Sequence, residues 1–220
     1  MTSDFRVTLL GTGTPIPRPD RFGPSTLVEA GQQKLLIDAG RGATMRLFQL
    51  GVPIGRIEAL LLTHFHSDHT VGIPDLWLTG WLSSYFGNRQ RSVNVIGPTG
   101  TKTLMHHLEA AYAHDIEIRV EDEKLSREHA AITVKEFTED GVVYQAGGLR
   151  VFGRSSATGA DRPDRLIGND QPAHLIGCQL VEPGADPARH PGEGAVVLTL
   201  PERFAAAHDR LCAVGGCGEH

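Results

Sequence analysis

The most informative segment of this sequence is Leu62-Thr63-His64-Phe65-His66-Ser67-Asp68-His69-Thr70. It holds three histidines and one aspartate within six residues, from His64 to His69. The preceding residues, 57–62, form a nearly continuous apolar run of strand length, which is typical of a strand covered on both faces. The cluster is therefore expected at the C-terminal end of a buried strand.

The spacing within the cluster suits metal binding. Residues two apart in an extended or gently turning segment point the same way, so His64 and His66 can hold one ion through ring nitrogens at about 2.0–2.1 Å. Asp68 and His69 diverge from that pair and suit a second ion about 3.5–4 Å from the first, as in two-metal hydrolases. This ligand set favours zinc, with manganese or iron as alternatives. A metal lowers the pKa of its bound water to about 7, so the pattern predicts a hydrolytic centre rather than a solvated polar loop.

The segments around the cluster predict a mixed α/β fold. Apolar patterns predict strands at residues 5–10, 26–30, 34–37, 93–96, 116–120, 132–137, 142–144 and 149–152. Helical spacing predicts one helix over residues 42–50 and a second that carries Leu104, Leu108 and Tyr112 on one side. Strands that alternate with helices in this way indicate layers of sheet and helix.

The composition fits one soluble globular domain. The chain has 220 residues, 40% of them hydrophobic, which is enough for a substantial core. Its formal net charge of -5 gives no general attraction to nucleic acid, so an RNA substrate is neither required nor excluded. Residues 1–5 show no signal-peptide pattern, and no apolar run is long enough for a bilayer. We therefore expect a cytoplasmic protein with no membrane partner.

Several motifs resemble a known superfamily. Thr63-His64-Phe65-His66-Ser67-Asp68-His69 resembles the signature of the metallo-β-lactamase superfamily. Residues 10–15, Asp38-Ala39-Gly40 and Gly97-Pro98 resemble its subgroup of ribonuclease Z and arylsulfatase-like hydrolases, and residues 74–81 make the arylsulfatase-like branch the closer match. The resemblance implies an α/β fold of the αββα sandwich type. It also implies two zinc ions in a cleft at one edge, where water attacks a phosphate, sulfate or carboxylate ester.

The resemblance further implies a role for each residue of the cluster. His64 and His66 would bind the first zinc, and Asp68 and His69 the second. Asp68 would also act as the general base, and Asp38 would lie behind the cluster and support its ligands. Histidine at position 66, where a di-iron redox relative has glutamate, favours hydrolysis. Family members are often dimers, so a homodimer is a further expectation.

The resemblance covers roughly residues 5–152 and leaves the family's later ligands unmatched. Those ligands are a histidine on the strand after the hairpin, an aspartate in an S-G-D-T-like turn that bridges both metals, and a late histidine. The predicted strand 149–152 runs into residues 153–156 without a histidine, and no S-G-D-T-like turn follows. The remaining late histidines lack a strand-end context and are interpreted as surface residues: His174, His190, His208 and His220.

The last part of the chain, residues 153–220, differs in character from the first. Residues 153–194 are rich in Gly, Pro, Asp and Arg, with only short apolar pieces, and we expect a loop-rich segment there. A strand over residues 195–200 and a helix capped by Thr199 and Glu202 could follow. We therefore divide the chain into an N-terminal part of a metallo-β-lactamase-like domain, 1–152, and a divergent segment. A frameshift near the boundary is the simplest hypothesis, with domain truncation as the alternative.

Two hypotheses of function remain open. The first is a zinc hydrolase of a small aryl sulfate or phosphodiester, favoured over an RNA substrate because the chain is acidic. With four ligands instead of about seven, its second ion would be weak and its hydrolysis slow or absent. The second hypothesis is a non-catalytic remnant that binds metal or a partner.

Aromatic and basic residues after the cluster have two interpretations each. Aromatic side chains could line a substrate pocket or belong to the core: Trp77, Trp81, Tyr85 and Phe86. Basic side chains could contact phosphate, but a solvated surface is expected: Arg89, Arg91 and Lys102.

Overall fold

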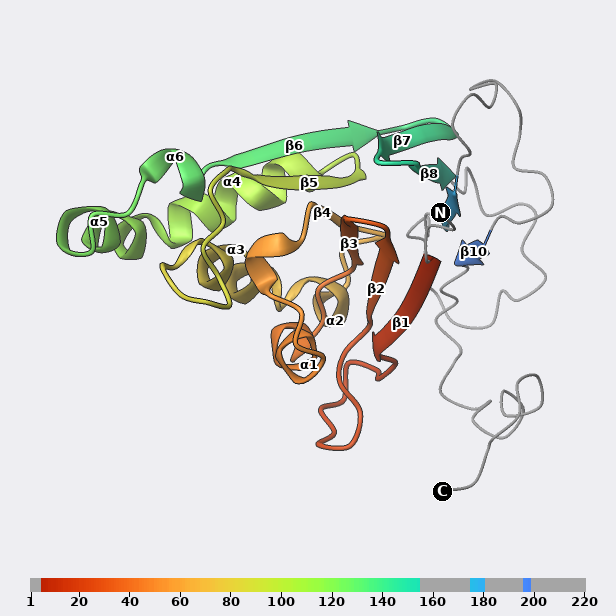
Figure 1. The fold of residues 1–220 in the computed structure, drawn as a ribbon, viewed down its shortest axis with the longest axis horizontal. Helices are drawn as coiled ribbons and strands as arrows, with labels where there is room; N and C mark the ends of the chain where they lie inside the picture. Colours follow the sequence, from red (N-terminus) through yellow and green to blue (C-terminus); the bar gives the residue numbers. More distant parts are fainter. Residues whose placement is uncertain (1–4, 155–174, 181–195, 199–220) are drawn as a thin grey trace.

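The computed structural model describes residues 5–154, 175–180 and 196–198 of the chain (Figure 1). In chain order the strands are β1 (Phe5–Gly11), β2 (Ser25–Ala30), β3 (Gln33–Ile37), β4 (Ala59–Leu61), β5 (Val93–Pro98), β6 (Ile132–Phe137), β7 (Gly141–Ala146), β8 (Leu149–Arg154), β9 (Leu175–Leu180) and β10 (Val196–Leu198). The helices are α1 (Ala43–Gln49), α2 (Ser67–Thr70), α3 (Ile73–Trp81), α4 (Thr101–Ala111), α5 (Ala113–Asp122) and α6 (Arg127–Ala130), with a 3-10 helix, η1, at Ile54–Arg56. This is the mixed α/β fold that the sequence predicts.

Six strands form the larger sheet, in the order β1-β2-β3-β4-β5-β6. The strands β1, β2 and β3 pair antiparallel, and β3 to β6 pair parallel. Parallel neighbours need crossover connections, which here carry α1, α3 and α4. The C-terminal ends of β3, β4 and β5 consequently share one edge of the sheet.

Side chains of the larger sheet alternate between two hydrophobic cores. Leu36 and Leu60 belong to the core on the helical side, together with Trp77 and Met105. Strand residues that point to the opposite face of the sheet belong to the core on the other side: Val28, Ala30, Leu35, Ile37, Ala59, Leu61 and Ile96. The strand before the histidine cluster is therefore buried on both faces, which confirms the interpretation of its apolar run.

Four antiparallel strands form the second sheet, in the order β10-β9-β8-β7. The β7–β8 hairpin turns at Gly147 and Gly148, whose φ angles are 54° and 80°, a conformation that glycine adopts without strain. Val143, Leu149 and Val151 pack in the core shared with the larger sheet. Figure 1 shows the helices on one side of the larger sheet and the second sheet on the other. The described residues thus supply the helix, sheet and sheet layers of the predicted sandwich.

Residues 175–180 form β9, although the sequence analysis expects a loop there. The backbone of β9 pairs with β8 over six positions, from Leu149 opposite Leu180 to Arg154 opposite Leu175. The apolar pieces in this part of the sequence are too short to show a period of two, and the neighbouring strand supplies the order. The division of the chain at residue 152 stays a prediction. The predicted helix after Thr199 lies outside the described residues.

Residues 116–120 lie in α5, so the strand predicted there is wrong. Ile116, Ile118 and Val120 alternate as in a strand, but Ile116 is 7% exposed and Ile118 is 44% exposed. Helical spacing of four also joins Tyr112, Ile116 and Val120, and these three side chains pack on the helical-side core. An i, i+4 pattern was therefore present in the same residues and is the one that the fold uses.

Trp77 and Trp81 are core residues rather than pocket residues. Their side chains are 1% and 3% exposed. The Trp77 Nε1 donates to the carbonyl oxygen of Ala130 at 2.7 Å, and the Trp81 Nε1 to that of Ser126 at 3.0 Å. Each indole thus keeps a hydrogen-bond partner inside the core, and each ties α3 to the segment around α6. Tyr85, by contrast, is 83% exposed.

Arg89 is buried, which corrects its interpretation as a solvated surface residue. It is 3% exposed. Its guanidinium donates to the carbonyl oxygens of Arg91 at 3.0 Å and His129 at 3.2 Å. Burial, and to a smaller extent the charge of Arg91, lowers the pKa of Arg89 to about 10. The planar guanidinium can enter the interior because backbone carbonyls accept its hydrogen bonds.

Within the described ranges, no helix is both long enough and apolar enough to cross a membrane.

Candidate metal centre

The histidine cluster lies at the edge where the parallel strands end. β4 ends at Leu61, and the chain continues through the cluster into α2. Because β3 and β4 pair in parallel with Ile37 opposite Leu61, Asp38 leaves the sheet beside Thr63. The backbone N–H of Asp38 donates to the carbonyl of Leu61 at 2.8 Å. The topology thus brings together residues that are far apart in the sequence, as the open edge of parallel sheets commonly does.

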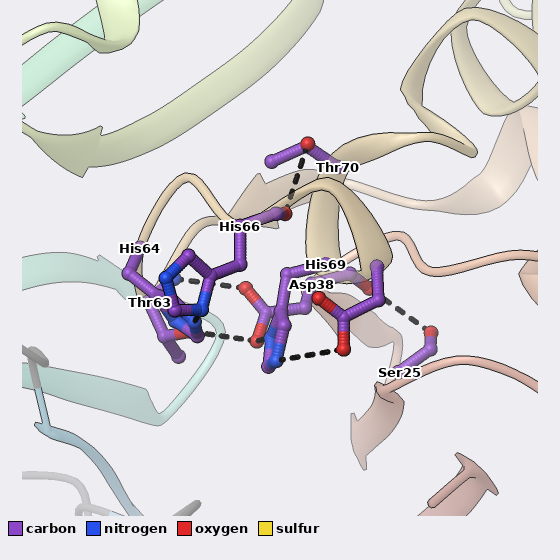
Figure 2. Close-up of polar contacts among 8 residues, drawn as sticks. Ser25, Asp38, Thr63, His64, His66, His69 and Thr70 are labelled. Carbon is purple, nitrogen blue, oxygen red and sulfur yellow. Dashed lines mark hydrogen bonds and ion pairs between the residues drawn. The ribbon is translucent and has the colours of Figure 1, made fainter. Parts of the chain in front are cut away.

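Asp38 is the centre of the hydrogen-bond network behind the cluster (Figure 2). Its side chain is fully buried. One carboxylate oxygen, Oδ1, accepts from the backbone N–H of Thr63 at 2.9 Å. The other, Oδ2, accepts from the Thr63 hydroxyl at 2.7 Å and lies 2.7 Å from the Nδ1 of His69. The Asp38 backbone has a φ of 58°, a left-handed conformation that aspartate tolerates better than most residues. In the structure, Asp38 thus lies behind the cluster and contacts both Thr63 and His69.

The four predicted ligands converge as two neighbouring pairs. His64 Nε2 and His66 Nδ1 are 3.1 Å apart. Asp68 Oδ2 and His69 Nε2 are 3.9 Å apart. The rings of His64 and His69 lie 4.0 Å apart between centroids, so the two pairs are adjacent. His64, Asp68 and His69 are buried, and His66 is half-buried.

Three glycines allow the main chain to pack directly against the cluster. A Cβ on Gly40 would lie 2.5 Å from the carbonyl oxygen of Asp68 and 2.5 Å from the backbone of Gly23. A Cβ on Gly72 would lie 2.6 Å from the carbonyl oxygen of Gly40. Backbone hydrogen bonds join the same segments, since the N–H of Ala39 donates to the carbonyl of His69 at 2.8 Å. Direct main-chain contacts therefore help to hold the cluster, in addition to the side-chain contacts of Asp38.

The donors fit zinc-type ligation in kind and orientation. Two nitrogen ligands at about 2.0–2.1 Å from a tetrahedral ion lie about 3.3–3.4 Å apart, close to the 3.1 Å between His64 and His66. The Nδ1 atoms of His64 and His69 contact the Thr63 hydroxyl and the Asp38 carboxylate, the usual support for histidines that bind metal through Nε2. In residues 5–154, 175–180 and 196–198, however, no three His, Cys, Asp or Glu side chains are arranged to hold one ion. The described donors thus form two pairs, His64 with His66 and Asp68 with His69.

Two residues of the site were not singled out by the sequence analysis. Thr63 was quoted only as part of the motif, although its side chain contacts both Asp38 and His64. Gly40 was quoted only for its resemblance to the subgroup, and its close backbone contacts explain why a glycine is needed there. The late histidines lie outside the described residues: His174, His190, His208 and His220.

A family model described as "Anti-Pycsar protein Apyc1" matches residues 5–140, more than half of the chain. The chain belongs to the Apyc1 family. The matched residues contain the whole histidine cluster, Asp38 and the larger sheet up to β6.

Curated relatives named Ribonuclease Z are also similar to the chain. The protein from Mycobacterium marinum is 41% identical over 147 residues, which are 67% of this chain and 52% of that protein. The protein from Mycolicibacterium gilvum is 44% identical over 140 residues, which are 64% of this chain and 48% of that protein. The chain thus spans about half the length of the curated relatives it matches. Its sequence is ribonuclease Z-like, which confirms the resemblance to that subgroup.

Solved structures confirm the fold. Human tRNase Z, short form, aligns with a TM-score of 0.58 and 19% identity, over 79% of this chain and 63% of that one. The metallo-β-lactamase fold protein YhfI from Bacillus subtilis aligns with a TM-score of 0.53 and 17% identity, over 81% of this chain and 58% of that one. The predicted metallo-β-lactamase fold is therefore correct.

Proposed function

We propose that the chain carries the metal centre of a metal-dependent phosphodiesterase whose substrate class is RNA. The observation that carries this proposal is the convergence of His64, His66, Asp68 and His69 at the edge of the larger sheet, with Asp38 behind them. The names of the relatives, Ribonuclease Z, support a phosphodiester bond as the target. They favour RNA over the small aryl sulfate or small phosphodiester that the acidic composition alone would favour.

Each residue of the site has a part in this proposal. His64 and His66 would hold one zinc ion, and Asp68 and His69 a second. Bound zinc supplies Lewis acidity and a nucleophilic water at neutral pH. The Asp68 carboxylate, 3.9 Å from His69, would act as the general base and accept the proton of the attacking water. Asp38 would keep His69 oriented through its Nδ1.

Hydrolysis by this chain is proposed to be slow. The described part of the chain supplies two donors for each ion, whereas a catalytic zinc usually has three protein ligands. The first ion would therefore bind weakly and the second more weakly still. The domain division at residue 152 and the frameshift hypothesis belong to the same proposal. Translation of the coding DNA in its other two frames past this point tests them. If neither frame restores a histidine strand and an S-G-D-T-like turn, a frameshift is excluded.

Metal content and turnover together test the proposed function. Zinc per chain is measured by equilibrium dialysis against micromolar zinc, and hydrolysis of bis(p-nitrophenyl) phosphate and of a structured RNA is followed with added zinc. We expect about one zinc ion per chain and slow phosphodiester hydrolysis that His66→Ala abolishes. His107→Ala, which changes an exposed histidine of α4, is the matched control and should keep both properties.

The other outcomes separate the alternatives. A chain that binds no zinc at micromolar concentrations would be a non-catalytic remnant, and the proposal would fail. Turnover that survives His66→Ala would also contradict it, because hydrolysis would then come from elsewhere. Faster turnover of an aryl sulfate than of either phosphodiester would reassign the substrate class.

We further propose a homodimer, as the family resemblance implies. The chain exposes large apolar side chains on neighbouring segments, with Phe48 55% and Tyr85 83% exposed. Phe48 and Tyr85 both contact the ring of Phe86, at centroid distances of 4.9 and 6.1 Å. Light scattering behind a sizing column gives the mass in solution, and a monomer at micromolar concentrations would contradict the proposal.

A further inference from the structure

The Thr63 hydroxyl connects the Asp38 carboxylate to the His64 ring. We infer that Thr63 is a positioning residue that fixes the proton of His64 on Nδ1 and so directs the lone pair of Nε2 toward the metal centre. The inference rests on the proposed function for its purpose, but it concerns hydrogen bonds within the chain itself. Figure 2 shows the contacts that carry it.

The direction of each hydrogen bond follows from the chemistry of the groups. The Thr63 hydroxyl has one proton and lies 2.7 Å from Oδ2 of Asp38 and 2.9 Å from Nδ1 of His64. A carboxylate oxygen only accepts, so the hydroxyl donates its proton to Asp38. The hydroxyl oxygen must then accept from His64, which places a proton on the Nδ1 of that ring. Asp38 thereby determines the tautomer of His64 through Thr63.

The same carboxylate orients the second pair of ligands directly. Oδ2 of Asp38 lies 2.7 Å from Nδ1 of His69, and it can only accept the proton of that nitrogen. His64 and His69 consequently present Nε2 through the same kind of hydrogen bond, one relayed and one direct. One buried carboxylate thus sets the ring orientation in both halves of the site. Because Asp38, His64 and His69 are all buried, water does not compete for these hydrogen bonds.

The relay also assigns the proton between His64 and His66. Nε2 of His64 carries a lone pair once Nδ1 is protonated, and it lies 3.1 Å from Nδ1 of His66. In the metal-free chain, His66 therefore donates from Nδ1 to Nε2 of His64. To offer Nδ1 to a metal, His66 must move its proton to Nε2, whereas His64 and His69 already have the tautomer that binding needs.

Nuclear magnetic resonance of the metal-free chain tests the relay. Long-range correlations between ring protons and ring nitrogens distinguish the two neutral tautomers, at about pH 8 where an ordinary histidine is neutral. The chain has 11 histidines, so His64→Gln and His69→Gln variants assign the two signals. We expect a protonated Nδ1 and an unprotonated Nε2 for both rings.

Substitutions of Thr63 separate a relay from a general structural role. Thr63→Val keeps the branched shape but loses the hydroxyl, so the His64 signals should shift to a mixture of tautomers while those of His69 stay unchanged. Zinc affinity should fall by about 10–100-fold, as for other residues that support a metal ligand. Thr63→Ser should restore both properties, and Thr103→Val, at an exposed position of α4, is the matched control.

Three results would contradict the inference, and a fourth would contradict only the proposed function. A protonated Nε2 on His64 in the unsubstituted chain would show that Thr63 does not relay. An unchanged His64 tautomer in Thr63→Val, or an equal disturbance of His69, would show that the hydroxyl has no specific role. A chain with the expected tautomers that binds no zinc would support the relay and contradict the proposed function, so the two can fail separately.

Discussion

Replacement of Asp38 by asparagine should destabilise the metal-free chain, because three donors converge on its carboxylate. These are the backbone N–H of Thr63 at 2.9 Å, the Thr63 hydroxyl at 2.7 Å and Nδ1 of His69 at 2.7 Å. Asparagine has nearly the same shape and also tolerates the φ of 58° at this position, so the change isolates the loss of charge and of one acceptor.

The size of the effect follows from the hydrogen bonds. The single carbonyl oxygen of asparagine can replace Oδ2, but its amide nitrogen then faces the N–H of Thr63. A hydrogen bond to a charged group contributes about 1.5–3 kcal/mol, and the two bonds that remain become neutral and weaker. We therefore expect the free energy of unfolding to fall by about 3–4 kcal/mol. For a chain of this size, the midpoint of thermal unfolding should fall by on the order of 10 °C.

The assay is thermal and urea unfolding followed by far-ultraviolet circular dichroism in the presence of a chelator. Asp68→Asn is the matched control, since Asp68 is also a buried carboxylate but its contact with His69 is at 3.9 Å. It should unfold within about 1 kcal/mol of the unsubstituted chain. An unchanged midpoint in Asp38→Asn, or an equal fall in Asp68→Asn, would refute the account of Asp38 as the structural centre of the site.

Three further changes test other parts of the structure. In urea unfolding, Ile116→Asp should destabilise the chain by about 2–4 kcal/mol because Ile116 is buried, and Ile118→Glu should change the free energy of unfolding by less than about 0.5 kcal/mol because Ile118 is exposed. Equal effects of the two substitutions would favour a strand over α5. Gly40→Ala should lower the free energy of unfolding by about 1–3 kcal/mol, because the new methyl group would overpack against the Asp68 carbonyl. Gly31→Ala, at an open turn with a φ of 56°, should lower it by about 1 kcal/mol. A smaller effect at Gly40 than at Gly31 would contradict the packing argument. Zinc should convert the His66 ring to its Nε2-protonated tautomer without changing that of His64, and a His66 ring that keeps its proton on Nδ1 with zinc bound would contradict its role as a ligand.

The strands of the larger sheet could be predicted because each has a simple pattern and a clear end. The apolar run of residues 57–62 is an example, although the strand itself is shorter and covers Ala59–Leu61. The run is longer than the strand because Ile57 and Leu62 also belong to the helical-side core. An apolar run indicates which residues are buried, whereas the strand contains only the residues that pair with neighbouring strands.

The error at residues 116–120 has a similar physical origin. Apolar residues at positions 116, 118 and 120 satisfy a period of two, and those at 112, 116 and 120 satisfy a spacing of four. Only the packing of α5 against the helical-side core decides between them. Arg89 was misjudged for a related reason, since the carbonyls that accept from its side chain come together only in the folded chain.

The proximity of the four predicted ligands could be read from the sequence, whereas Asp38 was expected behind them only from the family resemblance and its hydrogen bonds could not be predicted. His64, His66, Asp68 and His69 are close in the sequence, so their spacing alone indicates a common site. Asp38 lies 25 residues from Thr63 and 31 from His69, and the hydrogen bonds depend on the parallel pairing of β3 with β4. The role of the Thr63 hydroxyl depends in turn on where Asp38 lies.

The direct contact of main chain with main chain at Gly23, Gly40 and Asp68 has a mechanical consequence. Where side chains lie between a strand and a packed helix, their rotations can absorb a small displacement of the strand. No side chain lies between the segment after β3 and α2, because their main chains are in direct contact. A movement of the segment after β3 should therefore move α2 and its predicted ligands with it. Substitutions that shift β3, even far from the histidines, should therefore change metal affinity more than equal shifts of α4 or α5 do.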